Sequence, residues 1–394
     1  MKEGWEYKKL GDIGTFIRGG NFSKRDFVED GFPCIHYGQI HMKFGVETLR
    51  NISSVPAEMV KNDRCAKKGD LVIAITSEDD AGSCKCTAWM GDYDVYVGGH
   101  TAIYRHTMQP KYVSYYFMSP YFQKDKLEYT HGFKVVEISP KDIAKISIPV
   151  PPLSEQQSIV DYLDSAFAKI DAMKANAEKA LNEAKALFQA SLKEMLEPKE
   201  GWEEKRIDEV CSIARGGSPR PIKDYITNDP NGLNWIKIGD TDMGGKYIYS
   251  TKEKIKPEGL KKSRWVEEDE FLLSNSMSFG RPYILKTNGC IHDGWLVLRD
   301  YQKYLDIDFF YYVLSSEFVQ KQFRTKAQGS TVSNLNTDRV ASVTIPVPSL
   351  FEQQSIVETL DSLKSKVDRL QENYNKISQE CDALKQAILR QVFE

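Results

Sequence analysis

The sequence has no long apolar run, little cysteine and little net charge. No apolar stretch approaches the roughly 18 residues that cross a bilayer, and residues 1–5 lead into no apolar signal segment. Seven scattered cysteines in 394 residues do not suggest a disulfide framework. These shortages argue against a membrane or secreted protein. We expect a chain with no membrane partner that folds in the reducing cytoplasm.

The net charge of −3 does not exclude a polyanion as partner. The excess of acid lies mainly in two regions of helical pattern, and the rest of the chain is neutral to slightly basic. A metal site is not indicated either. Cys65, Cys84, Cys86, His100 and His106 do not have the spacing of a structural zinc site, so we predict no metal.

One stretch of thirteen residues occurs twice in the chain. It reads IPVPPLSEQQSIV at residues 148–160 and IPVPSLFEQQSIV at residues 345–357, an offset of 197 with eleven identities. In each copy an apolar run typical of a strand ends in prolines, which neither continue a ladder nor sit inside a helix. Ser154 with Gln157, and Ser349 with Glu352, have the spacing of a capping box. Each copy therefore predicts a strand followed at once by a helix.

A heptad pattern follows each copy of this stretch. Seam positions recur at alternating steps of four and three over more than four heptads, which is typical of a coiled coil. The seam residues are Ile159, Leu163, Ile170, Met173 and Leu187 in the first region, with alanines among them, and Ile356, Leu360, Leu363, Val367, Leu370, Ile377, Leu384 and Ile388 in the second. Because small residues on one helix complement large ones on the other, we expect the helices to pack together. The alternative is two separate amphipathic helices.

The repeat extends over the whole chain. Gly-Trp-Glu at residues 4–6 and Arg-Gly-Gly at residues 18–20 recur at the same offset. Between them, short β-branched runs alternate with turns, and one helical segment precedes the last strand, at about 113–126 in the first half and 309–323 in the second. We predict an α+β fold. Two similar mixed α/β domains occupy residues 1–151 and 198–348, and helical regions occupy 152–197 and 349–394.

Helix length narrows the architecture and suggests a role. Roughly forty helical residues at about 1.5 Å each carry the chain about 60 Å. No connector is long enough for a parallel return, so we expect an antiparallel coiled coil that separates the two domains. Related domains at a fixed separation suit duplex DNA, where half-sites one turn apart lie about 34 Å from centre to centre. Divergence between the domains then indicates two different half-sites.

With this layout the chain resembles the specificity (S) subunits of type I restriction–modification enzymes. The resemblance rests on Pro-x-Pro-x-Leu-x-Glu-Gln-Gln at each domain-to-helix junction and on the heptads that follow, and it covers essentially all 394 residues. It implies that each domain recognises one half of a bipartite, asymmetric target in double-stranded DNA. The helices would set the spacer and dock two modification (methyltransferase) subunits.

The resemblance also implies a non-catalytic chain without a cofactor of its own. S-adenosylmethionine, ATP and Mg are expected on the methyltransferase subunits and on restriction subunits with translocase and nuclease activity. The residues agree, since the sequence has no Gly-x-x-x-x-Gly-Lys-Ser/Thr phosphate loop and no Asn/Asp-Pro-Pro-Tyr/Phe motif. His292 and Asp293 look like an acid–base pair, but the first half has no matching acid beside His100.

Candidate DNA contacts lie in loops that flank the predicted strands. The two Arg-Gly-Gly loops offer arginines and backbone amides to phosphates or base edges, although a plain tight turn explains them as well. The loops before the last strands suit phosphate contact, or are simply solvated. The candidates are Arg18, Gly19, Gly20, Tyr37, Gln39, Ser77, His100 and Lys134 in the first half and Arg215, Gly216, Gly217, Ser218, Arg220, Lys237, Ser276, Arg281, Lys326, Gly329 and Ser330 in the second.

The residues alone leave other functions open. One is the specificity subunit of another bipartite-target methylation or restriction system, which depends on the partners. Another is a coiled-coil adaptor that binds two protein ligands and no DNA. The salt dependence of DNA affinity separates the adaptor from the specificity subunits, because DNA binding through phosphates weakens steeply as salt rises.

Overall fold

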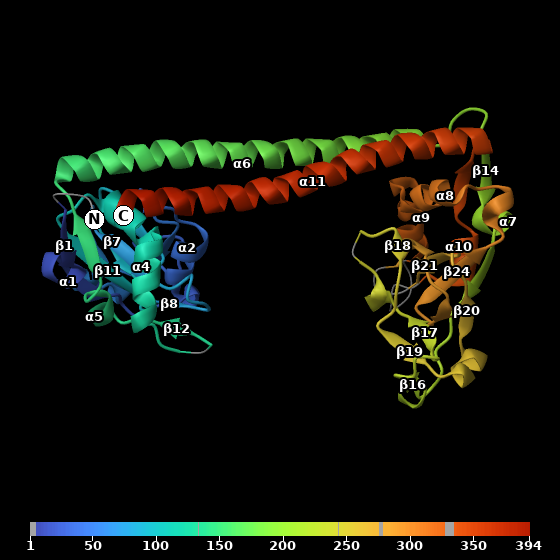
Figure 1. Ribbon diagram of the computed structural model, residues 1–394, viewed down its shortest axis with the longest axis horizontal. Helices are drawn as coiled ribbons and strands as arrows, with labels where there is room; N and C mark the ends of the chain where they lie inside the picture. Colours follow the sequence, from blue (N-terminus) through green and yellow to red (C-terminus); the bar gives the residue numbers. More distant parts are fainter. Residues whose placement is uncertain (1–4, 133, 243, 276–278, 328–334) are drawn as a thin grey trace. The chain divides into compact units, whose positions relative to one another are not determined.

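The computed structural model describes residues 5–132, 134–242, 244–275, 279–327 and 335–394. The chain forms two compact units, one comprising residues 1–178 with 374–394 and the other comprising 179–373. Each unit holds one globular half and parts of two long helices, α6 (Leu153–Leu196) and α11 (Leu350–Phe393) (Figure 1). The predicted α+β class, with two similar halves and two long helices, is confirmed.

The first globular half runs from β1 to β13. Its five-stranded sheet has the order β2-β11-β7-β9-β4 and its four-stranded sheet the order β5-β3-β10-β6, with two short ladders, β1–β13 and β12–β8. The strands are β1 (Glu6–Lys9), β2 (Gly14–Arg18), β3 (Phe32–Ile35), β4 (Glu47–Thr48), β5 (Ser53–Val55), β6 (Cys65–Ala66), β7 (Leu71–Ala74), β8 (Thr76–Ser77), β9 (Cys86–Trp89), β10 (Val95–Val97), β11 (Thr101–His106), β12 (Val136–Glu137) and β13 (Ser147–Val150). The α-helices are α1 (Leu10–Ile13), α2 (Tyr37–Met42), α3 (Pro110–Met118), α4 (Pro120–Asp125) and α5 (Pro140–Ile143), and the 3₁₀ turns are η1 (Lys24–Asp26), η2 (Ala57–Met59), η3 (Asn62–Arg64) and η4 (Lys126–Tyr129).

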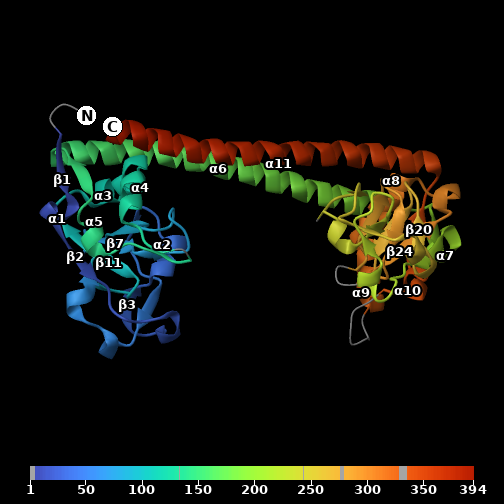
Figure 2. The same cartoon turned by 60° about the horizontal axis from the view of Figure 1, so that its bottom comes forward.

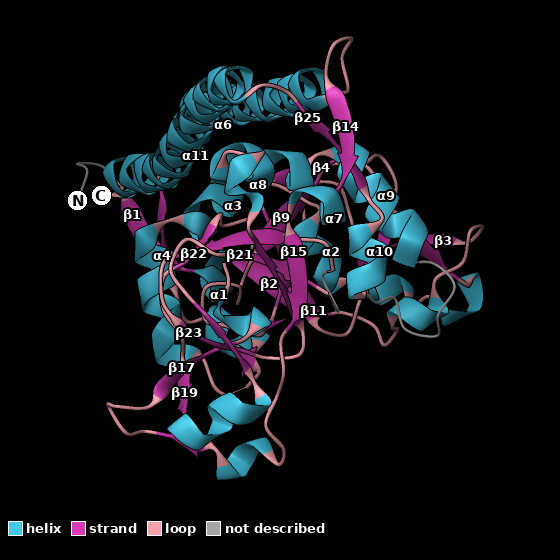
Figure 3. Cartoon of the chain, turned by 90° about the vertical axis from the view of Figure 1, so that its right-hand side faces the viewer, coloured by secondary structure: helices cyan, strands magenta, loops and turns pink. Residues whose placement is uncertain are grey.

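The second globular half repeats this plan from β14 to β25. Its sheets have the orders β15-β24-β21-β22-β18 and β16-β19-β17-β23-β20, with a ladder β14–β25; β17, β19 and β23 lie together in Figure 3. The strands are β14 (Glu203–Arg206), β15 (Ser212–Arg215), β16 (Ile226–Thr227), β17 (Leu233–Ile236), β18 (Tyr247–Ile248), β19 (Glu253–Ile255), β20 (Arg264–Val266), β21 (Phe271–Ser274), β22 (Pro282–Leu285), β23 (Gly289–Ile291), β24 (Trp295–Arg299) and β25 (Thr344–Val347). The α-helices are α7 (Ile207–Val210), α8 (Ile307–Ser315), α9 (Glu317–Ala327) and α10 (Thr337–Ala341), and the 3₁₀ turns are η5 (Ile222–Asp224), η6 (Ile238–Asp240), η7 (Pro257–Lys262) and η8 (Tyr301–Lys303).

The central strands β7 and β21 are apolar at successive positions because both of their faces are covered. In β7, Leu71 and Ile73 enter one core, and Val72 and Ala74 enter another on the opposite face. The first of these cores also contains α3 and the neighbouring parts of α6 and α11. Helix α3 therefore lies between the sheet and the long helices, as Figure 2 shows.

The single helical segment that we predicted before the last strand is two helices in each half. In the first half α3 ends before Pro120, and Ser119 caps α4 by accepting a hydrogen bond from the Phe122 amide. In the second half Ser316 lies between α8 and α9 and accepts from the Val319 amide at 3.4 Å. A capping serine competes with the helical backbone for hydrogen bonds, so the helix breaks at this residue.

The long helices run antiparallel to one another within each unit. In the first unit Lys385 of α11 pairs with Asp171 of α6 at 2.5 Å, and Asp382 of α11 pairs with Lys174 of α6 at 3.5 Å. In the second unit the Lys185 amine donates to the Gln371 side chain at 2.7 Å. The sequence numbers rise on one helix as they fall on the other, as expected for antiparallel partners.

The buried face of α6 differs from the predicted seam. Met173 and Leu187 are each 59% exposed, and Leu384 of α11 is 48% exposed, so the prediction was wrong for these three. On α6 the large residues Phe167 and Leu181 are buried instead, one position beyond the alanines that the heptad selected. After Cys381, the end of α11 packs into the first globular core. The other predicted seam residues, Ile159, Leu163, Ile170, Ile356, Leu360, Leu363, Val367, Leu370, Ile377 and Ile388, are buried or half-buried.

One glutamine of the duplicated Glu-Gln-Gln sequence fastens each globular half to its helix. Gln353 is fully buried. Its side-chain oxygen accepts from the Asp306 amide at 2.8 Å, and its amide nitrogen donates to the carbonyls of Tyr304 (2.8 Å) and Pro348 (2.9 Å). Asp306 caps α8, so a single side chain joins the starts of two helices.

The equivalent glutamine of the first half makes a similar but smaller set of bonds. Gln156 is 2% exposed. It accepts from the Gln109 amide at 2.9 Å and donates to the Pro151 carbonyl at 2.8 Å. Gln109 caps α3, just as Asp306 caps α8. The repeated motif thus has a structural reason in both halves, because buried polar backbone groups must be hydrogen-bonded.

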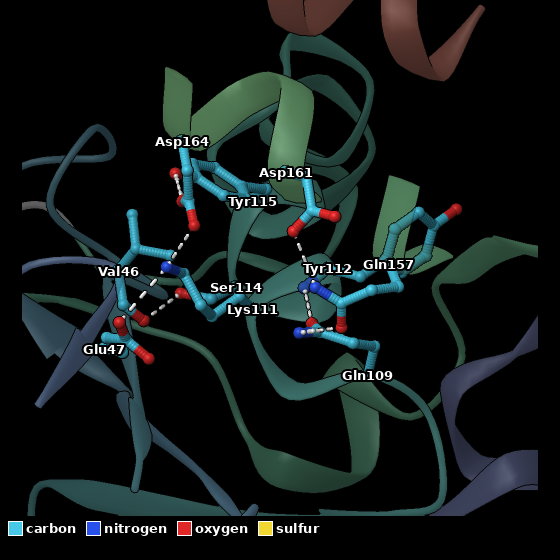
Figure 4. Close-up of polar contacts among 10 residues, drawn as sticks. All are labelled: Val46, Glu47, Gln109, Lys111, Tyr112, Ser114, Tyr115, Gln157, Asp161 and Asp164. Atoms are coloured by element: carbon cyan, nitrogen blue, oxygen red, sulfur yellow. Dashed lines mark hydrogen bonds and ion pairs between the residues drawn. The ribbon is translucent and has the colours of Figure 1, made fainter. Parts of the chain in front are cut away.

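The capping box that we predicted is present in only one copy. At Ser349 the hydroxyl accepts from the Glu352 amide, and the Glu352 carboxylate accepts from the Ser349 amide at 3.1 Å. Ser154 instead lies inside α6, which begins at Leu153. Gln157 donates to Asp161 and accepts from the Gln109 side chain, as Figure 4 shows.

A tyrosine–aspartate pair joins each half to its helix further along. Tyr115 donates to Asp164 at 2.6 Å, and Asp164 also pairs with Lys111 at 2.5 Å (Figure 4). In the second half Tyr312 donates to Asp361 at 2.5 Å. These pairs recur at the offset of 197 and sit on the faces of α3 and α8 that contact the long helices.

Of the helices in the described residues, none has the length and apolar character that crossing a membrane requires.

Candidate nucleic-acid interface

The Arg-Gly-Gly motif that ends β2 is fixed by backbone hydrogen bonds to its neighbours. The Gly19 amide donates to the Thr101 carbonyl at 3.0 Å, and the Gly20 amide donates to the Val97 carbonyl at 2.6 Å. The Arg64 guanidinium donates to the Gly19 carbonyl at 2.9 Å. The motif thus lies beside the turn that joins β10 to β11.

The glycine amides of the motif that ends β15 make the same two bonds. The Gly216 amide donates to the Trp295 carbonyl at 2.9 Å, and the Gly217 amide donates to the Ile291 carbonyl at 3.1 Å. The Arg264 guanidinium donates to the carbonyl of the motif's own arginine at 2.7 Å. Both halves therefore share one backbone scaffold here. Counting between the matched bonds, Gly99 of the first half corresponds to Asp293 of the second.

The glycines of both motifs allow two backbone segments to pack closely. Their amides do not bind phosphate, so our prediction that they could was wrong. A side-chain carbon on Gly19 would lie 1.9 Å from the Gly98 carbonyl oxygen, and one on Gly216 would lie 2.2 Å from that of His292. Only glycine allows this approach. Because all four motif amides already donate within the protein, Gly19, Gly20, Gly216 and Gly217 have no amide hydrogen left for a phosphate.

A hollow of about 720 Å³ lies beside the motif in the first half. Its lining includes Asn21, Ser23, His36, Tyr37 and His100. The Tyr37 ring stands edge-on to His100, with centroids 5.1 Å apart, and contacts His36 at 4.4 Å. Burial, together with nearby positive charge, lowers the pKa of His36 below its usual 6.5, so this imidazole is neutral at pH 7. The lining also includes the carboxylate of Asp26, so the hollow presents aromatic rings, polar groups and one acid.

The corresponding hollow of the second half, of about 750 Å³, contains an arginine and a lysine, residue types that the lining of the first hollow lacks. Its lining includes Ser218, Arg220, Lys237, His292 and Asp293. The carboxylate of Asp293 accepts from the Ser218 hydroxyl at 2.7 Å and lies 3.5 Å from the Arg220 guanidinium. Hydrogen bonding from Ser218 is the main cause that lowers the pKa of Asp293, so the carboxylate is charged at neutral pH.

The structure thus brings five sequence-predicted residues into two equivalent hollows. Tyr37 and His100 line the first, and Ser218, Arg220 and Lys237 line the second. The two motif arginines lie nearby on the surface. Arg18 pairs with Glu137 at 3.1 Å, and Arg215 donates to the Asp293 carbonyl at 3.1 Å.

The remaining candidates lie elsewhere. Gln39 is buried and bonds to the His36 amide and to the Ser53 hydroxyl, so its prediction as a base-reading residue was wrong. Ser77 bonds to Asp79. Lys134 and Arg281 are exposed in loops, and Lys326 is half-buried near the end of α9; for these the sequence prediction stands as a prediction. Ser276, Gly329 and Ser330 lie outside the described residues.

Sequence reasoning did not select several polar residues of the hollows, among them Asn21, Asp26 and His36 in the first and His292 and Asp293 in the second. Asn21 follows directly on the first motif, and Asp293 was considered only as half of an acid–base pair. No sequence signal linked Asp293 to the arginines of the motif, because the fold alone brings these segments together. No group of three His, Cys, Asp or Glu side chains that could hold a metal ion occurs among the described residues.

Comparison with known proteins adds independent evidence. The chain matches the family described as "Type I restriction modification DNA specificity domain" over residues 2–183 and 199–379. It is 22% identical over 422 residues to the StySPI specificity subunit of a type I restriction enzyme of Salmonella potsdam, covering 100% of this chain and 89% of the relative.

Two solved structures share the fold. One, from a study of complex assembly in the type I R-M system, has a TM-score of 0.80 at 20% identity and covers 100% of this chain and 98% of its own. The other, the HsdS subunit from Thermoanaerobacter tengcongensis, has a TM-score of 0.63 at 19% identity, covering 100% and 97%.

Proposed function

The chain belongs to the family of type I restriction–modification DNA specificity subunits, and on that premise we propose that its two globular halves read the two halves of one asymmetric DNA target. As a specificity subunit it has two target-recognition domains. The family assignment favours this function over the protein adaptor that composition and repeat alone left open.

The observation that carries the proposal is the pair of equivalent hollows with different linings. The backbone bonds around them match one for one, from Gly19 and Gly216 onward. The side chains do not match, because Tyr37, His100 and Asp26 line the first hollow, whereas Arg220, Lys237 and Asp293 line the second. A common scaffold with variable side chains suits base reading, since base edges are distinguished by their donors, acceptors and methyl groups.

We assign the recognition domains to residues 1–151 and 198–348, and the helical regions to 152–197 and 349–394. The helices set the spacer between the half-sites and dock two methyltransferase subunits, and restriction subunits join the same complex. In this proposal the chain is not itself an enzyme and acts in the cytoplasm. S-adenosylmethionine, ATP and Mg belong to the partners.

A map of methylated adenines in the source organism, with and without this gene, tests the function. We expect one bipartite motif to lose its methylation when the gene is deleted, because no other chain would direct the methyltransferase to it. Restoring the gene is the control and should restore the motif. An unchanged map, in cells where the partner genes are shown to be expressed, would contradict the proposal.

Lengthening both helices tests their role as the spacer. One heptad inserted after Glu178 in α6 and one after Lys376 in α11 keep the seam in register. At about 1.5 Å per residue the insertions add about 10 Å, or about three base pairs. We expect both half-sites to stay the same while the preferred spacer grows, as measured by methylation of DNA with graded spacers. A heptad inserted in α6 alone is the control and should impair assembly, and an unchanged spacer preference would exclude the helices as the measuring element.

A further inference from the structure

Asp293 forms hydrogen bonds and an ion pair with side chains from distant parts of the second globular half. Its carboxylate accepts from the Ser218 hydroxyl at 2.7 Å and lies 3.5 Å from the Arg220 guanidinium. Its carbonyl accepts from the Arg215 guanidinium at 3.1 Å and from the Asn275 side-chain amide at 3.0 Å. The aspartate is therefore held in position through both its backbone and its side chain.

Arg220 is the cation of this hollow with the most freedom to contact a ligand. Its side chain is 82% exposed, and its ion pair with Asp293 uses one terminal nitrogen, Nη2. Lys237 is less available, because its amine pairs with Glu253 at 2.8 Å and its side chain is 31% exposed. Arginine has five N–H donors, so the bond to Asp293 leaves the rest of the guanidinium for another partner.

The ion pair between Arg220 and Asp293 has no counterpart among the described residues of the first globular half. At the constant offset of 197 the first half has Ser23 where the second has Arg220. The matched backbone bonds place Gly99 where the second half has Asp293. The surrounding scaffold is the same in both halves, so this arginine and its carboxylate are a difference in what the hollow can bind.

We propose that Arg220, oriented by Asp293, reads a guanine in the major groove of the half-site that the second domain binds. This deepens the proposed function and rests on it. Arginine contacts the O6 and N7 acceptors of guanine with two parallel hydrogen bonds, which is the commonest specific contact of its kind. A carboxylate that holds the guanidinium beforehand lowers the entropy lost on binding.

Three variants in the complete complex with its methyltransferase partner test this inference: Arg220→Ala, Arg220→Lys and Asp293→Asn. The readout is methylation of a DNA library in which each base pair of the target is varied. We expect Arg220→Ala to reduce discrimination at one G·C pair of the second half-site by about 10- to 100-fold. Discrimination in the first half-site should not change. Arg220→Lys should restore discrimination only in part, because a lysine lacks the two-pronged geometry, and Asp293→Asn should reduce it at the same base pair.

Lys261→Ala is the matched control, since it removes an equal charge from an exposed site of the same half. It should leave every base preference as it was. The DNA affinity of each variant, measured over a range of salt concentrations, distinguishes a base contact from a phosphate contact. A lost phosphate contact reduces the slope of log affinity against log salt by about one. A uniform loss across all sequences with a reduced slope in Arg220→Ala would overturn the inference, as would unchanged discrimination. If the unaltered complex methylated no bipartite site, the proposed function itself would fail.

Discussion

Replacing Gln353 by alanine is expected to destabilise the second globular half by about 3–4 kcal/mol. The substitution removes three hydrogen bonds and leaves the Asp306 amide and the carbonyls of Tyr304 and Pro348 buried without a partner. Each unsatisfied buried group costs about 1–3 kcal/mol, and partial repacking absorbs some of this. Urea unfolding of the purified chain measures the total, and hydrogen exchange at the start of α8 locates it.

Two further substitutions make the result specific. Gln156→Ala in the first half removes two bonds rather than three, so we expect a smaller loss of about 2–3 kcal/mol. Gln354→Ala changes an exposed neighbour and should alter stability by no more than about 0.5 kcal/mol. Equal effects of Gln353→Ala and Gln354→Ala would show that the buried glutamine does not fasten the domain to its helix.

The duplicated motif was informative because it is local. A strand, two prolines and a helix start within thirteen residues follow from backbone restrictions alone. Helix α11 begins directly after its predicted cap, Ser349, and α6 begins one residue before Ser154. The motif alone does not explain why Glu-Gln-Gln recurs. The bonding partners of Gln353 at residues 304 and 306 are far along the chain, and only the fold brings them to the helix.

The heptad pattern was a weaker guide to the buried face of α6. Steps of four and three describe more than one stripe, and the stripe through Ala166 and Met173 differs by one residue from the stripe through Phe167. The helix buries the larger side chain because that removes more apolar surface from water. The ends of α6 and α11 also pack into the globular cores. A coiled-coil pattern does not predict this packing.

The hollows could be predicted only in part. Composition and loop position selected Tyr37, His100, Arg220 and Lys237, since polar and aromatic side chains in loops are typical of binding residues. Their grouping depends on the parallel pairing of β3 with β10 and of β17 with β23. That pairing joins strands separated by more than fifty residues, so no sequence pattern places Asp293 beside Arg220.

Replacing Gly216 by alanine is expected to destabilise the second globular half by at least about 3 kcal/mol and to abolish reading of its half-site. The new side-chain carbon would lie 2.2 Å from the His292 carbonyl oxygen and 2.9 Å from that of Ile291. Both neighbours are backbone atoms, so relief requires β15 to move away from the turn before β24. That movement breaks the bonds to Trp295 and Ile291; overpacking of this kind costs about 1–3 kcal/mol, occasionally more, before the lost bonds are added.

Gly239→Ala is the matched control, because no atom lies within 4 Å of the added carbon. It should leave stability unchanged or raise it by about 0.4–1 kcal/mol, since alanine restricts the unfolded chain. Hydrogen exchange at β15, β23 and β24 locates the effect, and methylation of targets altered in one half-site at a time measures the loss of recognition. Because the first scaffold is separate, Gly216→Ala should spare discrimination in its half-site. A stable Gly216→Ala variant with intact recognition would show that the close approach of the two backbones does not shape the hollow.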